Sequence, residues 1–392
     1  LPAETDDYNQ QSLYTRHSVS YLHKRNGFSK QLIADLTAEA ARYRLTSPAQ
    51  RTHFNASHLS ARLEPRLQWE RGKLFASARM PVGWQHYLGA RQSFLLYSPN
   101  LYLRYLHDYH WKFSVYGGME RAGGNALDLC PTVRRTDYRT LTGTNGLMPL
   151  STTFTGQLYA EYKNTVQEFF ATATLTYSHG RHTTLYEQYL SADSLYLLRR
   201  AQGNTTNTWT LQASLSKGIF DWHLKTSLDL QLSRHHGEQL TRTSSSEALL
   251  QQFRYDYLKA EPKVIWSPAP WLEATYHATI SCSATQIDRD THLSPLLDVV
   301  QRLELKFDIG QVDLQVGGEH YRNALGNGRH LSNLLADVSA IWHHDRWRME
   351  AGLSNLFNQK SYAYSTYTAT QSRTDWLRIR PREFILKVSY QF

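Results

Sequence analysis

The sequence has very little cysteine, and this scarcity removes two classes of protein. Only two cysteines, Cys130 and Cys282, occur among 392 residues, so a disulfide framework and a cysteine-based metal site are both excluded. One bridge between them is conceivable outside the cytoplasm, since Cys130 falls in a long predicted loop and Cys282 near the outer end of a predicted strand. Spacing alone leaves this pairing open.

Long hydrophobic runs are also missing. No stretch of 18 apolar residues occurs, which excludes a transmembrane helix, and the mean hydropathy is -0.54. The first residues lack the basic and apolar segments of a secretory signal, so we expect Leu1 to follow an upstream segment. Leu1-Pro2 begin next to a polar acidic stretch, Glu4-Thr5-Asp6-Asp7, as in an exposed loop that a protease could cut.

The formal net charge of +9 allows an anionic partner, such as lipopolysaccharide or a nucleic acid. Lysine and arginine are, however, scattered along the chain, and no nucleic-acid-binding motif accompanies them. We therefore expect no nucleic-acid partner, and lipopolysaccharide with its surrounding lipid is the anionic partner that we expect. Aromatic residues of the kind found at membrane interfaces are abundant, with 25 tyrosines, 14 phenylalanines and 10 tryptophans.

The end of the chain alternates in polarity. Strand side chains repeat every two residues, so the last segment has an apolar face of Phe384, Leu386, Val388, Tyr390 and Phe392 and a polar face of Lys387, Ser389 and Gln391. An apolar face suits lipid and a polar face suits a wet lumen. This pattern predicts the last strand of a transmembrane β-barrel, and a low mean hydropathy is typical of such alternating strands.

Eight tight turns recur between alternating segments. They are Arg25-Asn26-Gly27, Arg71-Gly72-Lys73, His107-Asp108-Tyr109, Lys163-Asn164-Thr165, Lys217-Gly218, Ser267-Pro268-Ala269-Pro270, Asp308-Ile309-Gly310 and His343-His344-Asp345. Seven tryptophans lie within a few residues of them and predict a periplasmic aromatic girdle: Trp69, Trp111, Trp222, Trp266, Trp271, Trp342 and Trp347. Periplasmic turns are short in such barrels, so the long connections 122–151, 181–204, 236–246, 324–331 and 358–380 are expected outside.

One strand on each side of every tight turn, plus the terminal strand, makes about 17 strands in a single antiparallel barrel domain covering residues 1–392. Single-chain bacterial barrels have even strand numbers, and an open edge leaves backbone groups unpaired in lipid. We therefore expect an upstream segment or a partner chain to supply the missing strands. A count wrong by one is the alternative, because segments 29–45 and 247–266 are long enough to contain a bulge or an extension.

Residues 352–358, Gly-Leu-Ser-Asn-Leu-Phe-Asn, are followed by a tyrosine-rich loop and then by Arg380-Pro381-Arg382-Glu383-Phe384 through Phe392. This pattern resembles the end of a TonB-dependent outer-membrane receptor, and the tyrosine-rich style is similar to members from Bacteroidota. The resemblance implies a 22-stranded barrel of which this chain forms strands 6 to 22. It also implies that the plug domain and the motif that grips TonB lie outside this chain.

The same resemblance implies that the complete protein imports a scarce nutrient across the bacterial outer membrane. Candidate ligand or partner loops carry Arg134, Arg135 and Arg139, and Tyr364, Tyr367 and Trp376. The assembly signal implied by the resemblance is Phe392, with Tyr390 and Val388. The alternative is a plug-free barrel that anchors or scaffolds an outer-membrane complex, with a surface lipoprotein among its candidate partners.

Several histidine and aspartate residues are candidates for a metal or catalytic site, but simpler interpretations explain them. His235, His236, His320, His330 and the pair His343-His344 are interpreted mainly as solvated side chains, because neighbouring strand residues point to opposite faces. Asp288, Asp290 and His292 cluster at an outer strand end, but a polar loop explains them better than a catalytic base. We therefore expect no enzyme activity, no metal and no cofactor.

Overall fold

The computed structural model describes residues 7–46, 51–136, 139–191, 194–242, 247–288, 291–325, 329–367 and 372–391. Two short 3-10 helices, η1 (Ala126–Leu129) and η2 (Phe220–Trp222), accompany strands that fill most of this length. The strands are β1 (Asp7–Arg25), β2 (Phe28–Thr46), β3 (Arg51–Asn55), β4 (His58–Arg71), β5 (Leu74–Arg79), β6 (Val82–Tyr87), β7 (Gln92–Tyr97), β8 (Asn100–Leu106), β9 (Trp111–Gly123), β10 (Val133–Arg135), β11 (Thr140–Gly143), β12 (Leu150–Asn164), β13 (Phe169–His182), β14 (Leu185–Ser191), β15 (Ser194–Arg200), β16 (Asn204–Ile219), β17 (Leu224–Arg242), β18 (Leu249–Ala269), β19 (Leu272–Ile287), β20 (Thr291–His292), β21 (Leu296–Ile309), β22 (Val312–Leu325), β23 (Arg329–His344), β24 (Trp347–Ser354), β25 (Ser361–Tyr367), β26 (Ser372–Arg378) and β27 (Glu383–Tyr390).

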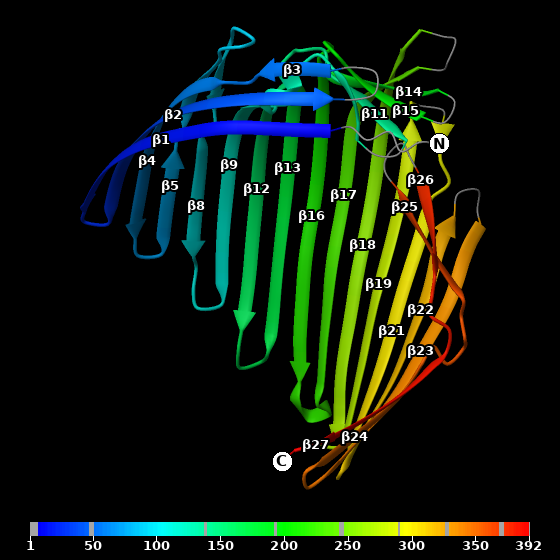
Figure 1. Cartoon of the computed structure of the whole chain (residues 1–392). Coiled ribbons are helices and arrows are strands. Elements are labelled where there is room, and N and C mark those ends of the chain that lie inside the picture. Colours follow the sequence, from blue (N-terminus) through cyan, green and yellow to red (C-terminus); the bar gives the residue numbers. More distant parts are fainter. Residues whose placement is uncertain are drawn as a thin grey trace.

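The strands form one large meander, which confirms the predicted all-β antiparallel fold. Successive antiparallel pairs run from β1–β2 through β2–β4 to β24–β27 (Figure 1). Each crossing of the sheet by the chain is called a pass, and two passes consist of two strands each. β5 and β6 form one of them, since both pair with β4. β7 and β8 form the next, since β7 pairs with β6 and β8 pairs with β5. Counted as passes across the sheet, the described residues provide 17, as predicted: β1, β2, β4, β5 with β6, β7 with β8, β9, β12, β13, β16, β17, β18, β19, β21, β22, β23, β24 and β27.

Prolines mark the two split passes. Pro81 separates β5 from β6, and Pro99 separates β7 from β8. Proline has no backbone N–H to give to a neighbouring strand, so a continuous ladder breaks at these positions. The carbonyls of both prolines still accept backbone hydrogen bonds, from Ser98 and Met119 respectively. The sheet therefore continues across both interruptions.

The turns at one end of the sheet are tight, and their chemistry explains the first of them. Asn26 and Gly27 have φ of 48° and 75° and connect β1 directly to β2. Two residues with positive φ match the twist of a hairpin, and Asn-Gly is the favoured pair for this purpose. In Figure 1 this turn and the other tight turns lie along the lower edge of the sheet.

The turn predicted at Lys217-Gly218 is wrong. β16 continues to Ile219, and the chain reverses through η2 to His223, which has φ of 47°. Gly218 is needed for a different reason: a Cβ there would overlap the Glu168 side chain of the neighbouring turn, and its N–H donates to the Glu168 carbonyl at 3.0 Å. The glycine marks a close approach between two segments of the chain rather than a turn.

All five connections predicted to be long outer loops contain strand: 122–151 holds β10 and β11, and 181–204 holds β14 and β15. β17 continues to Arg242, β22 reaches Leu325 with β23 resuming at Arg329, and segment 358–380 holds the β25–β26 hairpin. β18 pairs with β19 in one register from Phe253 to Trp266, and its register shift lies beyond segment 247–266, between Trp266 and Ala269. In 236–246 and 324–331, the polar side chains that suggested loops belong to strands that continue beyond the apolar part of the sheet, whereas β25 and β26 form a separate two-stranded sheet.

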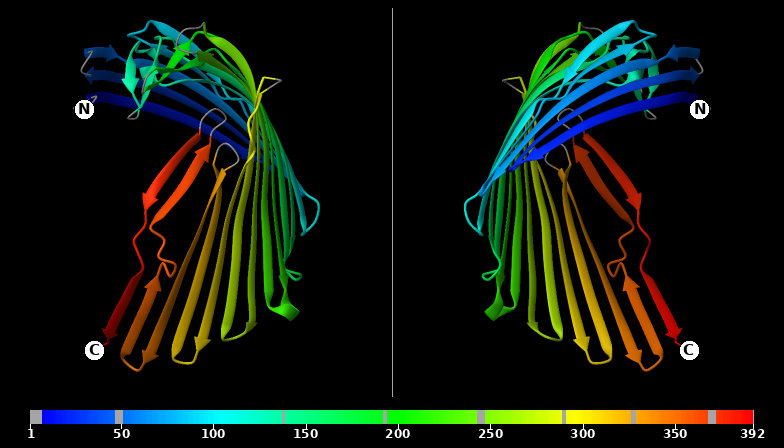
Figure 2. Two further views of the ribbon diagram at one scale, coloured as in Figure 1. Left: turned by 90° about the vertical axis from the view of Figure 1, so that its right-hand side faces the viewer. Right: turned by 90° about the vertical axis from the view of Figure 1, so that its left-hand side faces the viewer.

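The meander has two free edges. Within the described part of the chain, β1 pairs only with β2, and β27 pairs only with β24. Figure 2 shows the sheet curved into an open trough, with the two chain ends on the same side and β1 and β27 apart from each other. None of the described helices has the length and apolar character needed to cross a membrane.

Candidate functional site

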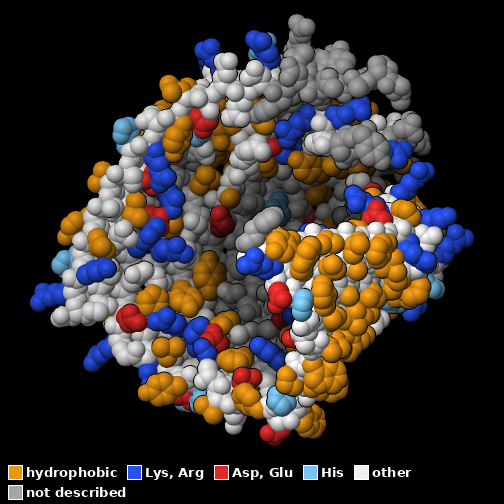
Figure 3. All heavy atoms as spheres, turned by 60° about the horizontal axis from the view of Figure 1, so that its bottom comes forward, with side chains coloured by type: hydrophobic (Ala, Val, Ile, Leu, Met, Phe, Trp, Pro, Cys, Tyr) orange, Lys and Arg blue, Asp and Glu red, His pale blue; other side chains and the backbone are white. Residues whose placement is uncertain are grey.

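The side chains of the meander separate into a polar concave face and an apolar outward face. Charged residues on the concave face form cross-strand or same-strand ion pairs at 2.7–3.1 Å: Lys112–Glu161, Lys259–Glu261, Arg302–Glu304 and Lys306–Glu273. Arg62 and Arg66 both contact the buried Glu64 on this face. Figure 3, seen from the end with the tight turns, shows charged side chains around the hollow and a broad hydrophobic area on the outer wall.

The outward face carries the apolar side chains that alternate with the polar ones along each strand. Register pairs align apolar side chains in rows across neighbouring strands, such as Leu215 with Leu228 and Leu305 with Val316. Many of these side chains are solvent-exposed, including Leu215, Leu230 and Leu303. A monomeric soluble protein rarely exposes contiguous apolar area of this extent, so the face requires a nonpolar environment.

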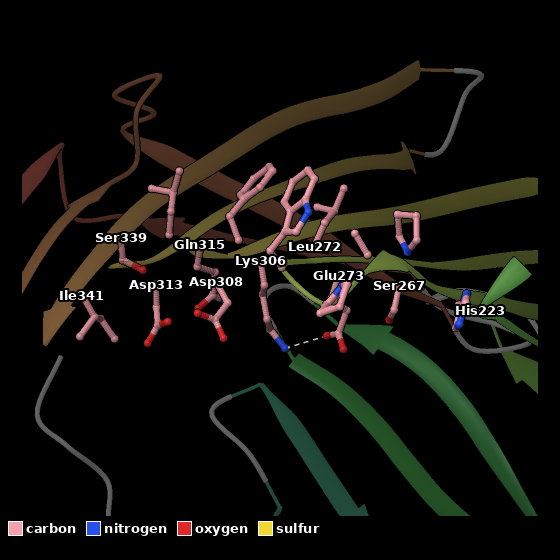
Figure 4. Close-up of a pocket in the computed structure, with 16 residues that line it drawn as sticks. His223, Ser267, Leu272, Glu273, Lys306, Asp308, Asp313, Gln315, Ser339 and Ile341 are labelled. Carbon is pink, nitrogen blue, oxygen red and sulfur yellow. Dashed lines mark hydrogen bonds and ion pairs between the residues drawn. The ribbon is translucent and has the colours of Figure 1, made fainter. Parts of the chain in front are cut away.

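A cavity of about 640 Å³ lies on the concave face near the tight turns (Figure 4). Glu273, Lys306, Asp308 and Asp313 point to one side of it, and Lys306 donates to Glu273 at 3.1 Å. His343 lies 3.3 Å from Asp313. The cavity thus holds more carboxylates than cationic side chains, at the end of the trough where the tight turns lie.

The outer connections form a folded unit, which we call the outer module, built from β10, β11, β14 and β15. β10 pairs with β11, β11 pairs in parallel with β15, β15 pairs with β14, and β14 pairs in parallel with residues 240–242 of β17. The module is therefore joined to the large sheet through the last residues of β17, beyond the apolar part of that strand. Two segments predicted to be separate loops, 122–151 and 181–204, are joined by backbone hydrogen bonds.

Two buried carboxylates hold the outer module together. Arg199 donates to Asp128 at 2.8 Å and to the Tyr186 hydroxyl, and its guanidinium lies 5.1 Å from the Tyr186 ring centroid. Glu187, which is almost fully buried, contacts Arg200 and lies 2.9 Å from Arg242 of β17. Both contacts cross between segments far apart in the sequence, so they fix the arrangement of the loops.

A small apolar core supports the same region. Tyr87, Leu129 and Met148 are buried together, and Phe54 and Phe94 pack against them. Most of the buried apolar residues of the described chain lie at this outer end, whereas the trough itself has few. The outer connections are consequently a packed structure rather than a set of independent loops.

The predicted basic residues of segment 122–151 do not share one surface. Arg134 is half-buried and pairs in register with the buried Thr142, while Arg135, its neighbour in β10, is exposed on the opposite face. Arg139 is exposed, and its carbonyl accepts a hydrogen bond from Leu195 at 2.7 Å. Burial raises the pKa of the nearby Cys130 thiol, and the charge of Arg134 opposes that rise.

The aromatic residues predicted in segment 358–380 lie on the β25–β26 hairpin. Trp376 is exposed and pairs in register with Ala363, and Tyr364 pairs with Asp375. The side chains of Tyr364 and Tyr367 lie outside the described residues. Ligand or partner contact by this hairpin stays a prediction.

The predicted girdle tryptophans lie near the tight turns, and five of them belong to the outward face. Register pairs join Trp69 to Phe28, Trp111 to Tyr162, Trp266 to Leu224, Trp342 to Val312 and Trp347 to Tyr390. Trp222 and Trp271 lie in the turns themselves. Val388 and Tyr390 of the predicted assembly signal are exposed on the outward side of β27, and Phe392 lies outside the described residues.

Both cysteines are free thiols. Asp288 has φ of 53° and accepts a hydrogen bond from the backbone N–H of Gln252 at 3.0 Å, so its carboxylate fastens a turn. His292 is exposed, and Asp290 lies outside the described residues. No group of three or more His, Cys, Asp or Glu side chains suited to a metal occurs in the part of the chain that the structure describes.

The residues of this region that the sequence did not reveal are those whose ion pairs hold the outer module together. Asp128, Glu187, Arg199 and Arg242 come from three separate segments, and no local spacing connects them. The only local hint is the Arg199-Arg200 pair at the end of an apolar strand. The periodicity of apolar residues is a local pattern, so it does not predict pairing between distant segments.

The fold and its two faces define a class: a large antiparallel sheet with a polar trough inside and an apolar wall outside. No protein-family model and no curated protein matches the chain. Solved structures similar to it include the Fiu ferric-catecholate import receptor of E. coli K12, at TM-score 0.37 and 8% identity, covering 100% of this chain and 82% of that one. They also include a mutant ferric enterobactin receptor, PfeA, of Pseudomonas aeruginosa, at TM-score 0.31 and 8% identity, covering 100% and 81%. The copper transporter OprC matches at TM-score 0.31 and 9% identity, covering 100% and 82%. At these values the similarity adds no argument to the strand order and the side-chain faces.

Proposed function

We propose that this chain forms most of the barrel of a bacterial outer-membrane receptor of the TonB-dependent type, which takes up a scarce nutrient. The observation that carries the proposal is the separation of faces, because ion-paired charges line the trough and apolar side chains form the outer wall. Lysine or arginine on the lipid face of a barrel costs about 2–4 kcal/mol at mid-bilayer, which accounts for charges being confined to the trough in the middle of the strands.

The free edges of β1 and β27 support a second part of the proposal. Unpaired strand edges are not tolerated in hydrocarbon, so further strands from an upstream segment or a partner chain complete the wall. In the proposed arrangement these residues are strands 6 to 22 of a 22-stranded barrel. The plug and the contact with TonB then belong to the segment outside this chain.

The receptor proposal is tested by cross-linking whole cells and isolating the protein from the outer membrane. We expect TonB and a plug-containing segment to be recovered with it, and energised uptake to stop when the plug is deleted. Recovery of neither TonB nor a plug would contradict the receptor proposal.

A plug-free scaffold is the second candidate, and the packed outer module favours it. Buried ion pairs and an apolar core give the outer end a fixed shape that a surface lipoprotein could recognise. Under this alternative the same isolation would yield a stoichiometric partner protein without TonB. The two candidates therefore give opposite results in one experiment.

A further inference from the structure

A groove of about 490 Å³ on the outward face has the composition of a lipid-binding site. It spans β13 and β16 to β19, and register pairs order its side chains in rows. The row nearer the tight turns is apolar throughout: Leu175, Leu211, Leu232, Leu258 and Cys282. The next row away from the tight turns is Tyr177, Trp209, Arg234, Asp256 and Ala284, and all of these except Tyr177 line the groove. The row beyond it includes His236 and Arg254, which lie next to the groove rather than in its lining.

The charged rows lie at the height where a bilayer ends. Leu224 begins β17 beside Trp266 at the inner rim, and Arg234 follows ten residues later. At about 3.3 Å per residue and a tilt of about 40°, ten residues rise roughly 25 Å, the thickness of the apolar band of such barrels. Trp209, which is exposed beside Arg234, is the residue type expected at that boundary.

The charged groups are arranged to receive an anion. Asp256 accepts from Arg234 at 2.7 Å and from Arg254 at 2.9 Å, and this shared carboxylate holds two guanidinium groups side by side. The arginine side chains are 54% and 41% exposed, so they are open to the surroundings. Two arginines against one aspartate leave a net positive charge, and guanidinium suits phosphate in geometry as well as in charge.

We propose that this groove binds lipopolysaccharide, with Arg234 and Arg254 contacting a phosphate of its lipid A headgroup and the leucine row contacting an acyl chain. Charge complementarity and the position at the outer boundary select a phosphorylated lipid of the outer leaflet. The proposal requires only that the outward face lies in the membrane, and it does not depend on uptake or on TonB.

The test measures binding of purified lipid A to the protein isolated from its native membrane and delipidated in detergent. We expect Arg234→Gln/Arg254→Gln to weaken binding by about tenfold or more, because charge-assisted hydrogen bonds to the phosphate are lost. Asp256→Asn removes the negative charge that competes with phosphate but keeps an amide oxygen that still accepts a hydrogen bond from an arginine, so this variant should bind lipid A at least as tightly as the native protein. Arg302→Gln, which removes an arginine from the concave face, is the matched control and should bind normally.

Further probes separate the headgroup from the acyl chain. Dephosphorylated lipid A should bind native protein about as weakly as lipid A binds the double variant, and Ala284→Trp should reduce binding by filling the groove while both arginines remain. Unchanged binding by the double variant would overturn the site. Equal affinity for phosphatidylglycerol and lipid A would overturn the choice of lipopolysaccharide as occupant.

Discussion

At the scale of single residues, the Arg199–Asp128 pair is a buried ion pair that links two segments of the outer module. Both side chains are more than nine-tenths buried, and the pair joins η1 to β15. Removing one partner of a buried ion pair leaves an uncompensated charge and costs about 3–5 kcal/mol. We therefore expect Asp128→Asn to open the module locally, with faster hydrogen exchange in residues 126–136, 139–143, 185–191 and 194–200.

The matched control for this variant is Asp35→Asn. Asp35 also pairs with an arginine, at 3.0 Å, but Arg16 is half-exposed, so the charge left behind by the substitution stays in contact with solvent and costs little stability. Exchange in the outer module should stay unchanged in the control. Equal protection in both variants would show that packing of Leu129 and Met148, rather than the ion pair, holds the module.

The Cys130 thiol gives a second prediction at this scale. Its pKa is raised by burial, so the reactive thiolate is scarce at neutral pH, and the charge of Arg134 limits the rise. Arg134→Gln should therefore move the labelling profile of Cys130 with a maleimide to higher pH. The measurement uses a Cys282→Ser background, with Arg135→Gln as the control on the opposite face of β10. A shift to lower pH, or equal shifts in both variants, would contradict the assignment.

At the scale of the strand, adjacent residues differ in environment because the side-chain period is two. Leu230 faces outward in the middle of β17, whereas Gln231 faces the trough. Leu230→Arg should destabilise the folded protein by about 2–4 kcal/mol in lipid vesicles, and Gln231→Arg should change stability little. Urea titration of unfolding from vesicles measures both. Equal destabilisation would exclude a lipid environment for the outer wall.

Strand-level features were largely predictable from the sequence, since alternation and turn residues are local. Asn26-Gly27 specifies its hairpin by backbone conformation alone. Gly218 misled the prediction because a glycine that permits close approach to Glu168 is indistinguishable in sequence from one that permits a turn. The continuation of β17 to Arg242 was also missed, because its support comes from pairing with β18 and β14.

At the scale of the whole molecule, the sequence predicts the number of passes but not how the outer connections combine. Seventeen passes follow from counting turns. The parallel pairings of β11 with β15 and of β14 with β17 join segments 50 or more residues apart, and no local rule selects them. The buried residues Asp128, Glu187 and Arg199 therefore acquire their roles only when those segments meet.

The two free edges of the sheet lead to the last prediction. If additional strands close the wall, β1 and β27 are not neighbours in the intact protein, and cysteines on them are too far apart to form a disulfide, which requires Cα atoms within about 7 Å. In a Cys130→Ser/Cys282→Ser background, Val388→Cys should therefore fail to cross-link with Val19→Cys, Tyr21→Cys or His23→Cys, three positions that sample different heights along β1. Met349→Cys with Val388→Cys, which are paired in register between β24 and β27, should cross-link efficiently and serves as the positive control. Efficient cross-linking of any β1 position to β27 would mean that the seventeen passes close on themselves, and the proposed additional strands would then have no place in the wall.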